Sequence, residues 1–223
     1  MLWCKQQQTA FPFFRSATGS LIVGAIVVGC TGAPQVTHSG FLRDYSLLRP
    51  DPAVEGAMTW RAPVEILKQY KQFIIEPVVV HFAPNAKGTA IDPAELKKLT
   101  DYFHDQLAKA VSETGRYQVV TAPGPGVARV RIAITDISKT APLANIHPAT
   151  KLTGIGLGGA AMEGEMVDSV SGERLGAAVD SESGARLGIT AGLQTYGHAK
   201  QVIDRWAARF VTRLDALHGY TKR

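Results

Sequence analysis

One amphipathic segment, residues 92–111, most constrains the fold that this chain can adopt. Asp92 is suited to cap a helix, Pro93 to occupy its first position, and Glu95 to complete a capping box. Apolar side chains then recur every three or four residues and form a single stripe: Leu96, Leu99, Phe103, Leu107 and Ala110. A helix with one apolar stripe buries it against another element, so the segment predicts a helix that packs on a second layer.

Strand-like segments on both sides of this helix supply that layer. The clearest is residues 73–82, where β-branched side chains occupy both faces as in an interior strand, although Pro77 interrupts the pattern. A second amphipathic helix is predicted at residues 196–218, with Trp206 on its buried face. Further strand patterns occur at residues 117–121, 128–137, 155–169 and 173–180.

The order of these elements predicts an α+β fold. We expect a two-layer sandwich with a mixed, mostly antiparallel sheet of about five strands and two helices on one face. The helix at 92–111 links the first two strands as a right-handed crossover, which makes those strands parallel. Hairpins or loops join the later strands, so these run antiparallel and place the loops 138–155 and 181–195 at the same end. A site built by the domain is expected at that end.

Residues 1–29 have the pattern of an export signal. Lys5 and Arg15 precede the apolar run 21–28, and the segment contains no acidic residue. The run is far shorter than the roughly 20 residues that span a bilayer. The sequence Val27-Val28-Gly29-Cys30 resembles the bacterial lipobox, in which cleavage leaves an acylated cysteine as the first residue. The alternative is plain secretion without a lipid.

The lipobox resemblance implies that Cys30 is a lipid attachment site carrying diacylglycerol and a further acyl chain such as palmitate. Two or more acyl chains anchor a protein stably to a membrane. In lipoproteins an Asp after the cysteine is associated with inner-membrane retention, and Thr31 stands there instead. The implied location is therefore the inner leaflet of the outer membrane, facing the periplasm.

The resulting boundaries are a signal peptide at 1–29, a flexible tether at 30–40, an irregular arm at 41–72 that docks through Phe41, Tyr45 and Leu48, and the α+β domain at 73–219.

Composition limits the possible partners. The formal charge of +5 falls to about +3 when Lys5 and Arg15 are removed, and so small a surplus does not indicate nucleic acid. The chain has two cysteines, Cys4 and Cys30, so cleavage leaves no pair for an internal disulfide. The hydrophobic fraction of 45% and the charged fraction of 19% are ordinary for a domain stabilised by its core.

Several residue patterns suggest chemistry, and each has a simpler structural interpretation. Residues 154–159 fit GxGxxG, but a loop before them and strand alternation after them favour a loop over a dinucleotide site. Glu163 and Glu165 are predicted to lie on one strand face. They are either a pair of acid–base carboxylates or solvated surface residues. His147 lies in the loop at the expected functional end. The six histidines form no HxH or HExxH, so no metal site is predicted.

A row of arginines lies on the last predicted helix. Arg205, Arg209 and Arg213 are four residues apart and therefore share one face. We interpret this row as a solvated face, because Asp204 and Asp215 dilute its charge. Contact with acidic lipid headgroups is the alternative.

The motifs taken together resemble a known family, the bacterial lipoproteins grouped as domain of unknown function 3313. The resemblance covers residues 38–217 and includes the Trp-bearing last helix. The remaining motifs are GFLRDYSLL at 40–48, FIIEPVVV at 73–80, VRIAITD at 130–136 and GGAAMEGEMVDSVSGERL at 158–175. It implies the envelope location and the fold. It implies no activity, and no functional residue besides Cys30.

Three functional hypotheses follow from these observations. The favoured one is a non-enzymatic envelope lipoprotein that binds an envelope protein partner as an accessory or structural component. The first alternative is a periplasmic carrier or sensor of a small apolar ligand, which requires a cavity of a few hundred Å³. The second alternative is a hydrolase that uses groups such as His147 with Glu163, which requires converging polar side chains. No catalytic residue, cofactor or metal ion is predicted.

Overall fold

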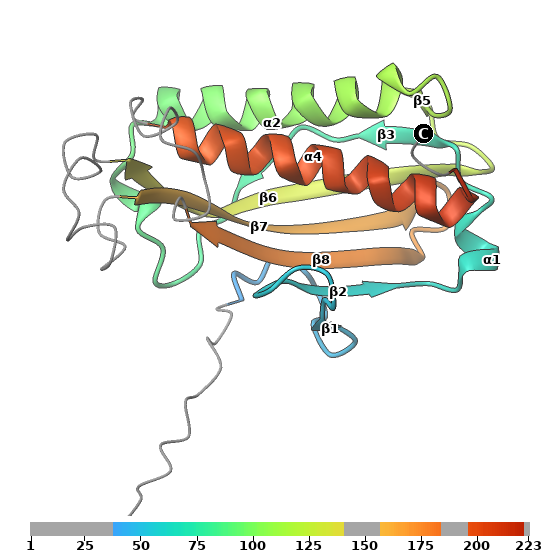
Figure 1. Ribbon diagram of the computed structural model, residues 1–223, viewed down its shortest axis with the longest axis horizontal. Helices are drawn as coiled ribbons and strands as arrows, with labels where there is room; N and C mark the ends of the chain where they lie inside the picture. Colours follow the sequence, from blue (N-terminus) through green and yellow to red (C-terminus); the bar gives the residue numbers. More distant parts are fainter. Residues whose placement is uncertain (1–37, 141–156, 184–195, 221–223) are drawn as a thin grey trace, which may run out of the picture. The chain divides into compact units, whose positions relative to one another are not determined.

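The computed structural model describes residues 38–140, 157–183 and 196–220 (Figure 1). Within these ranges the strands form one open sheet in the order β1-β2-β8-β7-β6-β3-β5, with β4 beside β6. The strands are β1 (Arg49–Pro50), β2 (Met58–Arg61), β3 (Gln72–Ile75), β4 (Val79–Val80), β5 (Gln118–Val119), β6 (Val127–Thr140), β7 (Leu157–Asp168) and β8 (Arg174–Ser183). The α-helices are α1 (Val64–Leu67), α2 (Pro93–Glu113) and α4 (Gly197–His218), and η1 (Gly88–Ala90) is a 3₁₀ helix.

The predicted mixed α+β architecture is confirmed, and the predicted strand number is wrong. The two long helices α2 and α4 lie side by side over one face of the sheet (Figure 1), with Phe103 stacked on Trp206 at 5.5 Å between ring centroids. The described residues form an 8-stranded sheet instead of one of about five strands. The three additional strands are short: β1 and β4 have 2 residues each and β2 has 4, too few to produce a readable alternation.

Helix α2 forms as its local signals predict. The side chain of Asp92 caps it by accepting a hydrogen bond from Ala94 N at 2.7 Å. The predicted apolar stripe is buried at Leu99, Phe103 and Leu107, each 1% exposed. These side chains pack against the sheet and α4 in one hydrophobic core. The two long helices are therefore held by apolar burial on a single sheet face.

Strand β3 has parallel neighbours on both sides. Its parallel pairing with β5 confirms the crossover through α2. The expectation that the later strands all run antiparallel is wrong for β6, which also pairs parallel with β3. The strand predicted at 73–82 ends at Ile75 and resumes as β4, because Pro77 cannot donate to the ladder. Strands β6, β7 and β8 form the antiparallel centre.

Residues 41–72, expected to be an irregular arm, contain regular structure that completes the sheet. Strand β2 pairs antiparallel with β8 from Met58 to Arg61. The segment before it covers the sheet face opposite α2 and α4, where Leu42 and Leu48 pack on Ala177 and Val179. Each of these elements is short, and its conformation depends on pairing with a distant strand.

The expected common end of the loops 138–155 and 181–195 is visible in the strands that lead to them. Ser138 pairs with Gly159, and Gly159 pairs with Ser183. Residues 141–156 and 184–195 themselves lie outside the described residues. Among the helices that the structure describes, none has the length and apolarity needed to cross a membrane.

Candidate functional site

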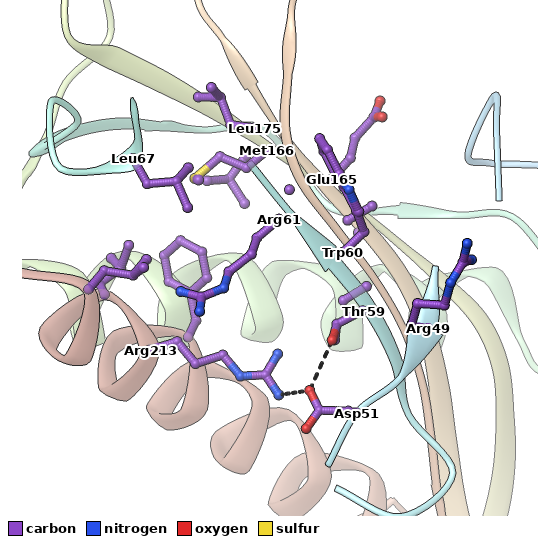
Figure 2. A pocket seen from close by; sticks show the side chains of 18 of the residues that line it. Arg49, Asp51, Thr59, Trp60, Arg61, Leu67, Glu165, Met166, Leu175 and Arg213 are labelled. Atoms are coloured by element: carbon purple, nitrogen blue, oxygen red, sulfur yellow. Dashed lines mark hydrogen bonds and ion pairs between the residues drawn. The ribbon is translucent and has the colours of Figure 1, made fainter. Parts of the chain in front are cut away.

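A cavity of about 670 Å³ lies between the C-terminal half of α4 and the sheet (Figure 2). The α4 side is lined by Phe210, Arg213, Leu214 and Leu217. Strands β6 and β7 contribute an apolar floor that includes Val130, Ile132, Met162 and Met166. Residues of β1, of β2 and of the segment between them form the border. A largely apolar cavity of this size is typical of small-molecule sites.

The cavity exists because small residues occupy the sheet face that α4 covers. Gly164 of β7 and Gly176 and Ala178 of β8 all line it. A Cβ placed on Gly164 would lie 3.5 Å from Arg131 O and from Ile132 Cγ1, which is ordinary van der Waals contact. Steric crowding therefore does not require a glycine at position 164. Large side chains at these positions would fill the space, so the small ones leave it open.

Three arginines, Arg49, Arg61 and Arg213, and the Asp51 carboxylate stand at the border of the cavity. Arg213 of α4 pairs with Asp51, with 2.5 Å between Nη2 and Oδ2, and Thr59 donates to the same oxygen at 3.1 Å. Burial opposes the charge on Asp51, but the Ala53 N–H and the Arg213 guanidinium outweigh it and hold the pKa of Asp51 below its ordinary value. Arg61 is exposed and makes no side-chain hydrogen bond or ion pair within the described ranges. Arg49 donates only to carbonyl oxygens, so among the described residues neither Arg49 nor Arg61 has a carboxylate partner, and the border carries two positive charges without a counter-ion.

The arginine row on α4 is not a solvated face, and that prediction is wrong. Arg205 pairs with Glu182, and Arg213 pairs with Asp51. Arg209 pairs with both Asp180 and Glu182, and the distance from Arg209 Nη2 to Glu182 Oε1 is 2.6 Å. The spacing of four residues was correctly interpreted as one helix face, but this face meets the edge of β8 instead of solvent.

Asp180 is the centre of this charged cluster. It is 2% exposed and accepts hydrogen bonds from Arg209 and from Trp206 Nε1, the latter at 3.0 Å. Among the described residues no donor reaches its Oδ1. Burial raises the pKa of Asp180 above its ordinary value, and Arg209 only partly opposes this. The cluster fixes α4 on β8 directly before the α4 residues that line the cavity.

Glu163 and Glu165 share one face of β7 as predicted, but each has its own partners. The Glu163 carboxyl group is 0% exposed and accepts hydrogen bonds from Ser39 N, Leu42 N and Tyr45 Oη at 2.6, 3.3 and 2.6 Å. Glu165 pairs with the guanidinium groups of Arg131 and Arg174. These contacts hold the N-terminal segment and the sheet face together. The two residues are neither solvated nor arranged as an acid–base pair.

Other predicted site residues lie outside the described residues. These include the lipid attachment residue Cys30, His147, and residues 154–156 of the GxGxxG pattern. Residues 157–159 of that pattern begin β7 and do not begin a helix, as the loop-and-strand interpretation requires. Within the described ranges, no three His, Cys, Asp or Glu side chains cluster to hold a metal ion.

The apolar-ligand hypothesis required such a cavity, but sequence reasoning did not identify the set of residues that forms it. Its lining residues come from several strands and one helix, and no motif joins them. The available signal was the pattern of small residues, Gly164 on one strand and Gly176 and Ala178 on the next, opposite an amphipathic helix.

Comparisons with known proteins place the chain in a family but supply no activity. A family model described as "Protein of unknown function (DUF3313)" matches residues 37–210. No curated protein matches the chain. Among solved structures it is similar to a PelC dodecamer from Paraburkholderia phytofirmans, with 14% identity over 71% of this chain and 95% of that chain and a TM-score of 0.42. It is also similar to a Xanthomonas campestris protein of family DUF330, with 11% identity over 68% of this chain and 90% of that chain and a TM-score of 0.39. Structural similarities this weak carry no inference about function.

Proposed function

This chain belongs to the DUF3313 family, whose function is unknown, and we propose that it is a lipid-anchored bacterial envelope protein whose domain binds a small apolar ligand without transforming it. One observation carries the choice of function: the cavity of about 670 Å³ under α4. A ligand carrier or sensor requires a space of a few hundred Å³. The cavity satisfies this requirement, and a solid core would have removed it.

The chemistry of the lining supports binding over catalysis. Met162, Met166 and Phe210 offer apolar and adaptable contacts, because methionine fills irregular spaces readily. The charged groups at the border are an Arg–Asp pair, Arg49 and Arg61, which stabilise charge but do not form a nucleophile–base pair. A hydrolase built on Glu163 finds no support in its position, since that carboxyl group is fully buried under the N-terminal segment.

Binding to an envelope protein partner, favoured from the sequence, has less support in the described residues. Their large exposed apolar side chains come from separate elements, such as Leu47 before β1, Val79 in β4 and Val170 in the β7–β8 turn. Single exposed apolar residues are normal on protein surfaces and do not indicate an interface. The cavity is the more specific feature.

The proposed anchor is Cys30, and it keeps the cavity close to the membrane. We place the protein at the inner leaflet of the outer membrane, facing the periplasm. Ser39, which is fixed to the sheet by Glu163, is nine positions after Cys30. A chain of that length reaches at most about 30 Å. An apolar ligand taken from the bilayer would therefore travel a short distance.

Replacing Cys30 with serine is expected to abolish lipid attachment. In cells grown with radiolabelled palmitate, the Cys30→Ser chain should carry no label and should leave the membrane fraction, because no acyl chain then anchors it. Cys4→Ser is the matched control, since Cys4 lies in the segment to be removed, and this variant should label normally. Equal labelling of the Cys30→Ser chain would contradict the assignment.

Filling the cavity is expected to block ligand binding without harming the fold. Gly164→Leu adds a side chain that points into the cavity from an unstrained position, so the free energy of unfolding should stay equal or rise by about 1 kcal/mol. Affinity for a long-chain apolar probe, measured by fluorescence titration, should fall at least about tenfold, because the chain and the leucine compete for one space.

Ser181→Leu is the matched control for this experiment. It adds the same side chain to β8 at an exposed position, next to Asp180, which faces α4. This variant should bind the probe as the unmodified chain does. Unchanged probe binding in a folded Gly164→Leu variant would show that the cavity is not the binding site.

A further inference from the structure

On the basis of this proposed function, we infer that the ligand is a single-chain anionic amphiphile, a long-chain fatty carboxylate, whose chain fills the cavity and whose head lies beside Arg61. The charge at the border and the volume of the cavity lead to this class independently.

Among the described charged residues that line the cavity, Arg49 and Arg61 have no carboxylate partner, and only Arg61 also lacks a hydrogen bond from its side chain. Asp51 is paired with Arg213, and Arg49 donates to the carbonyl oxygens of Ser46 and Leu48. Glu165 points away from the cavity in Figure 2 and is paired on the opposite face of the sheet. The remaining charged residue of the lining is Arg61, whose side chain reaches from β2 toward α4 (Figure 2). A guanidinium binds a carboxylate through two parallel hydrogen bonds.

The volume selects one acyl chain over two. A cavity of about 670 Å³ corresponds to about 22 groups of the size of a water molecule, at about 30 Å³ each. A methylene group is of similar size, so one chain of 16 to 18 carbons with its head group is accommodated. A diacyl lipid would place much of its second chain in water, at a cost of about 0.8 kcal/mol for each methylene left exposed.

The distribution of polar groups fixes the orientation of this ligand. Leu214, Leu217 and Met162 offer no partner to a charged group, and burying an unpaired carboxylate among them is costly. Arg61 is exposed, so a head group beside it stays partly hydrated and also gains a counter-ion. The carboxylate is therefore at the β2 border and the chain extends under α4.

The experiment uses the full chain carrying Cys30→Ser, so that no acyl chain of its own occupies the cavity. Trp60 borders the cavity from β2 and Trp206 lies on α4, so quenching of tryptophan fluorescence by bromine atoms on a bound chain measures occupancy. Three dibrominated probes of equal chain length are titrated below their aggregation limits: a carboxylate, an alcohol and a quaternary ammonium. We expect the carboxylate to bind about fivefold more tightly than the alcohol, the value for a solvent-exposed ion pair, and the ammonium to bind most weakly. High salt should reduce this difference.

The Arg61→Gln variant tests the role of the guanidinium. Its affinity for the alcohol should be unchanged, and its preference for the carboxylate should disappear. Arg43→Gln, which removes an exposed arginine that does not line the cavity, should retain the full preference. Equal affinities for all three probes would overturn the anionic ligand, and a preference that survives Arg61→Gln would overturn the placement of its head beside Arg61; both results leave an apolar ligand in place. Absence of binding by every probe would overturn the proposed function itself.

Discussion

Replacing Arg209 with methionine is expected to lower the free energy of unfolding by about 3 kcal/mol at neutral pH. Methionine retains much of the apolar stem, so the main loss is the guanidinium. Asp180 and Glu182 would then lie buried with less compensation, at 2% and 6% exposure. Removing one partner of a buried ion pair is far more costly than the pair itself is stabilising. Chemical denaturation with an unchanged m-value would measure the difference.

The size of this loss should depend on pH in a defined direction. Burial raises the pKa of Asp180 in the folded protein above its ordinary value of 3.8. The stability that Asp180 contributes is therefore fully present below pH 3.8, and it is lost as the pH rises through the pKa of Asp180 in the folded protein. Arg209 opposes this rise, so its removal should move the folded pKa of Asp180 further upward. The Arg209→Met penalty should thus be largest at neutral pH and shrink toward pH 4.

A combined variant separates uncompensated charge from lost packing. Adding Asp180→Asn and Glu182→Gln to Arg209→Met removes both carboxylate charges with little change of shape. At neutral pH at least half of the lost stability should return, and the pH dependence should flatten. If stability does not return, packing of the Arg209 stem and not charge compensation fixes α4 on β8.

The elements that the sequence predicted well are those whose signals are local. For α2, the Asp92 cap, Pro93 and the apolar stripe all lie inside the segment and agree with one another. Strands β1 and β4 have 2 residues each, and their pairing with β2 and β6 depends on residues outside each short segment. A pattern inside so short a segment cannot specify a partner, which is why the strand count and part of the strand direction were wrong.

The charged cluster shows what a helical pattern leaves open. Arginine spacing on α4 places the three side chains on one face, but it does not say what that face meets. The complementary signal is on β8, where Asp180 and Glu182 alternate and therefore point to the same side of the sheet. Two carboxylates on the helix-covered face of a strand require cations from that helix, because unpaired buried charge is costly.

Replacing Glu163 with alanine is expected to release residues 38–48 from the sheet. The change leaves Ser39 N and the Tyr45 hydroxyl without their acceptor, leaves Leu42 N with only the Tyr45 hydroxyl at 3.3 Å, and opens a void under the segment. The free energy of unfolding should fall by about 3 kcal/mol, since hydrogen bonds to a carboxyl group and burial are lost together. Hydrogen exchange with mass spectrometry should show lost protection in residues 38–48, with protection of α2 retained.

Graded variants identify the carboxyl group as the cause of that release. Tyr45→Phe removes one of the donors, so it should cost about 1 kcal/mol and raise exchange only modestly. Arg43→Ala changes an exposed side chain of the same segment and should leave exchange unchanged. If Arg43→Ala increases the exchange of residues 38–48 as much as Glu163→Ala does, the segment is weakly held and the Glu163 carboxyl group is not what fixes it.

The Glu163 contact also determines how far the proposed anchor lets the domain stand from the membrane. With Ser39 fixed, the sheet holds the chain nine positions after Cys30, a reach of about 30 Å. If residues 38–48 are released as a whole, the first residue held by strand pairing is Arg49 of β1, nineteen positions after Cys30, a reach of about 65 Å. Glu163→Ala should therefore increase the span over which a crosslinker joins the domain to the lipid surface. Glu163 is then a positioning residue for the cavity, although it lies on the face of the sheet opposite α4.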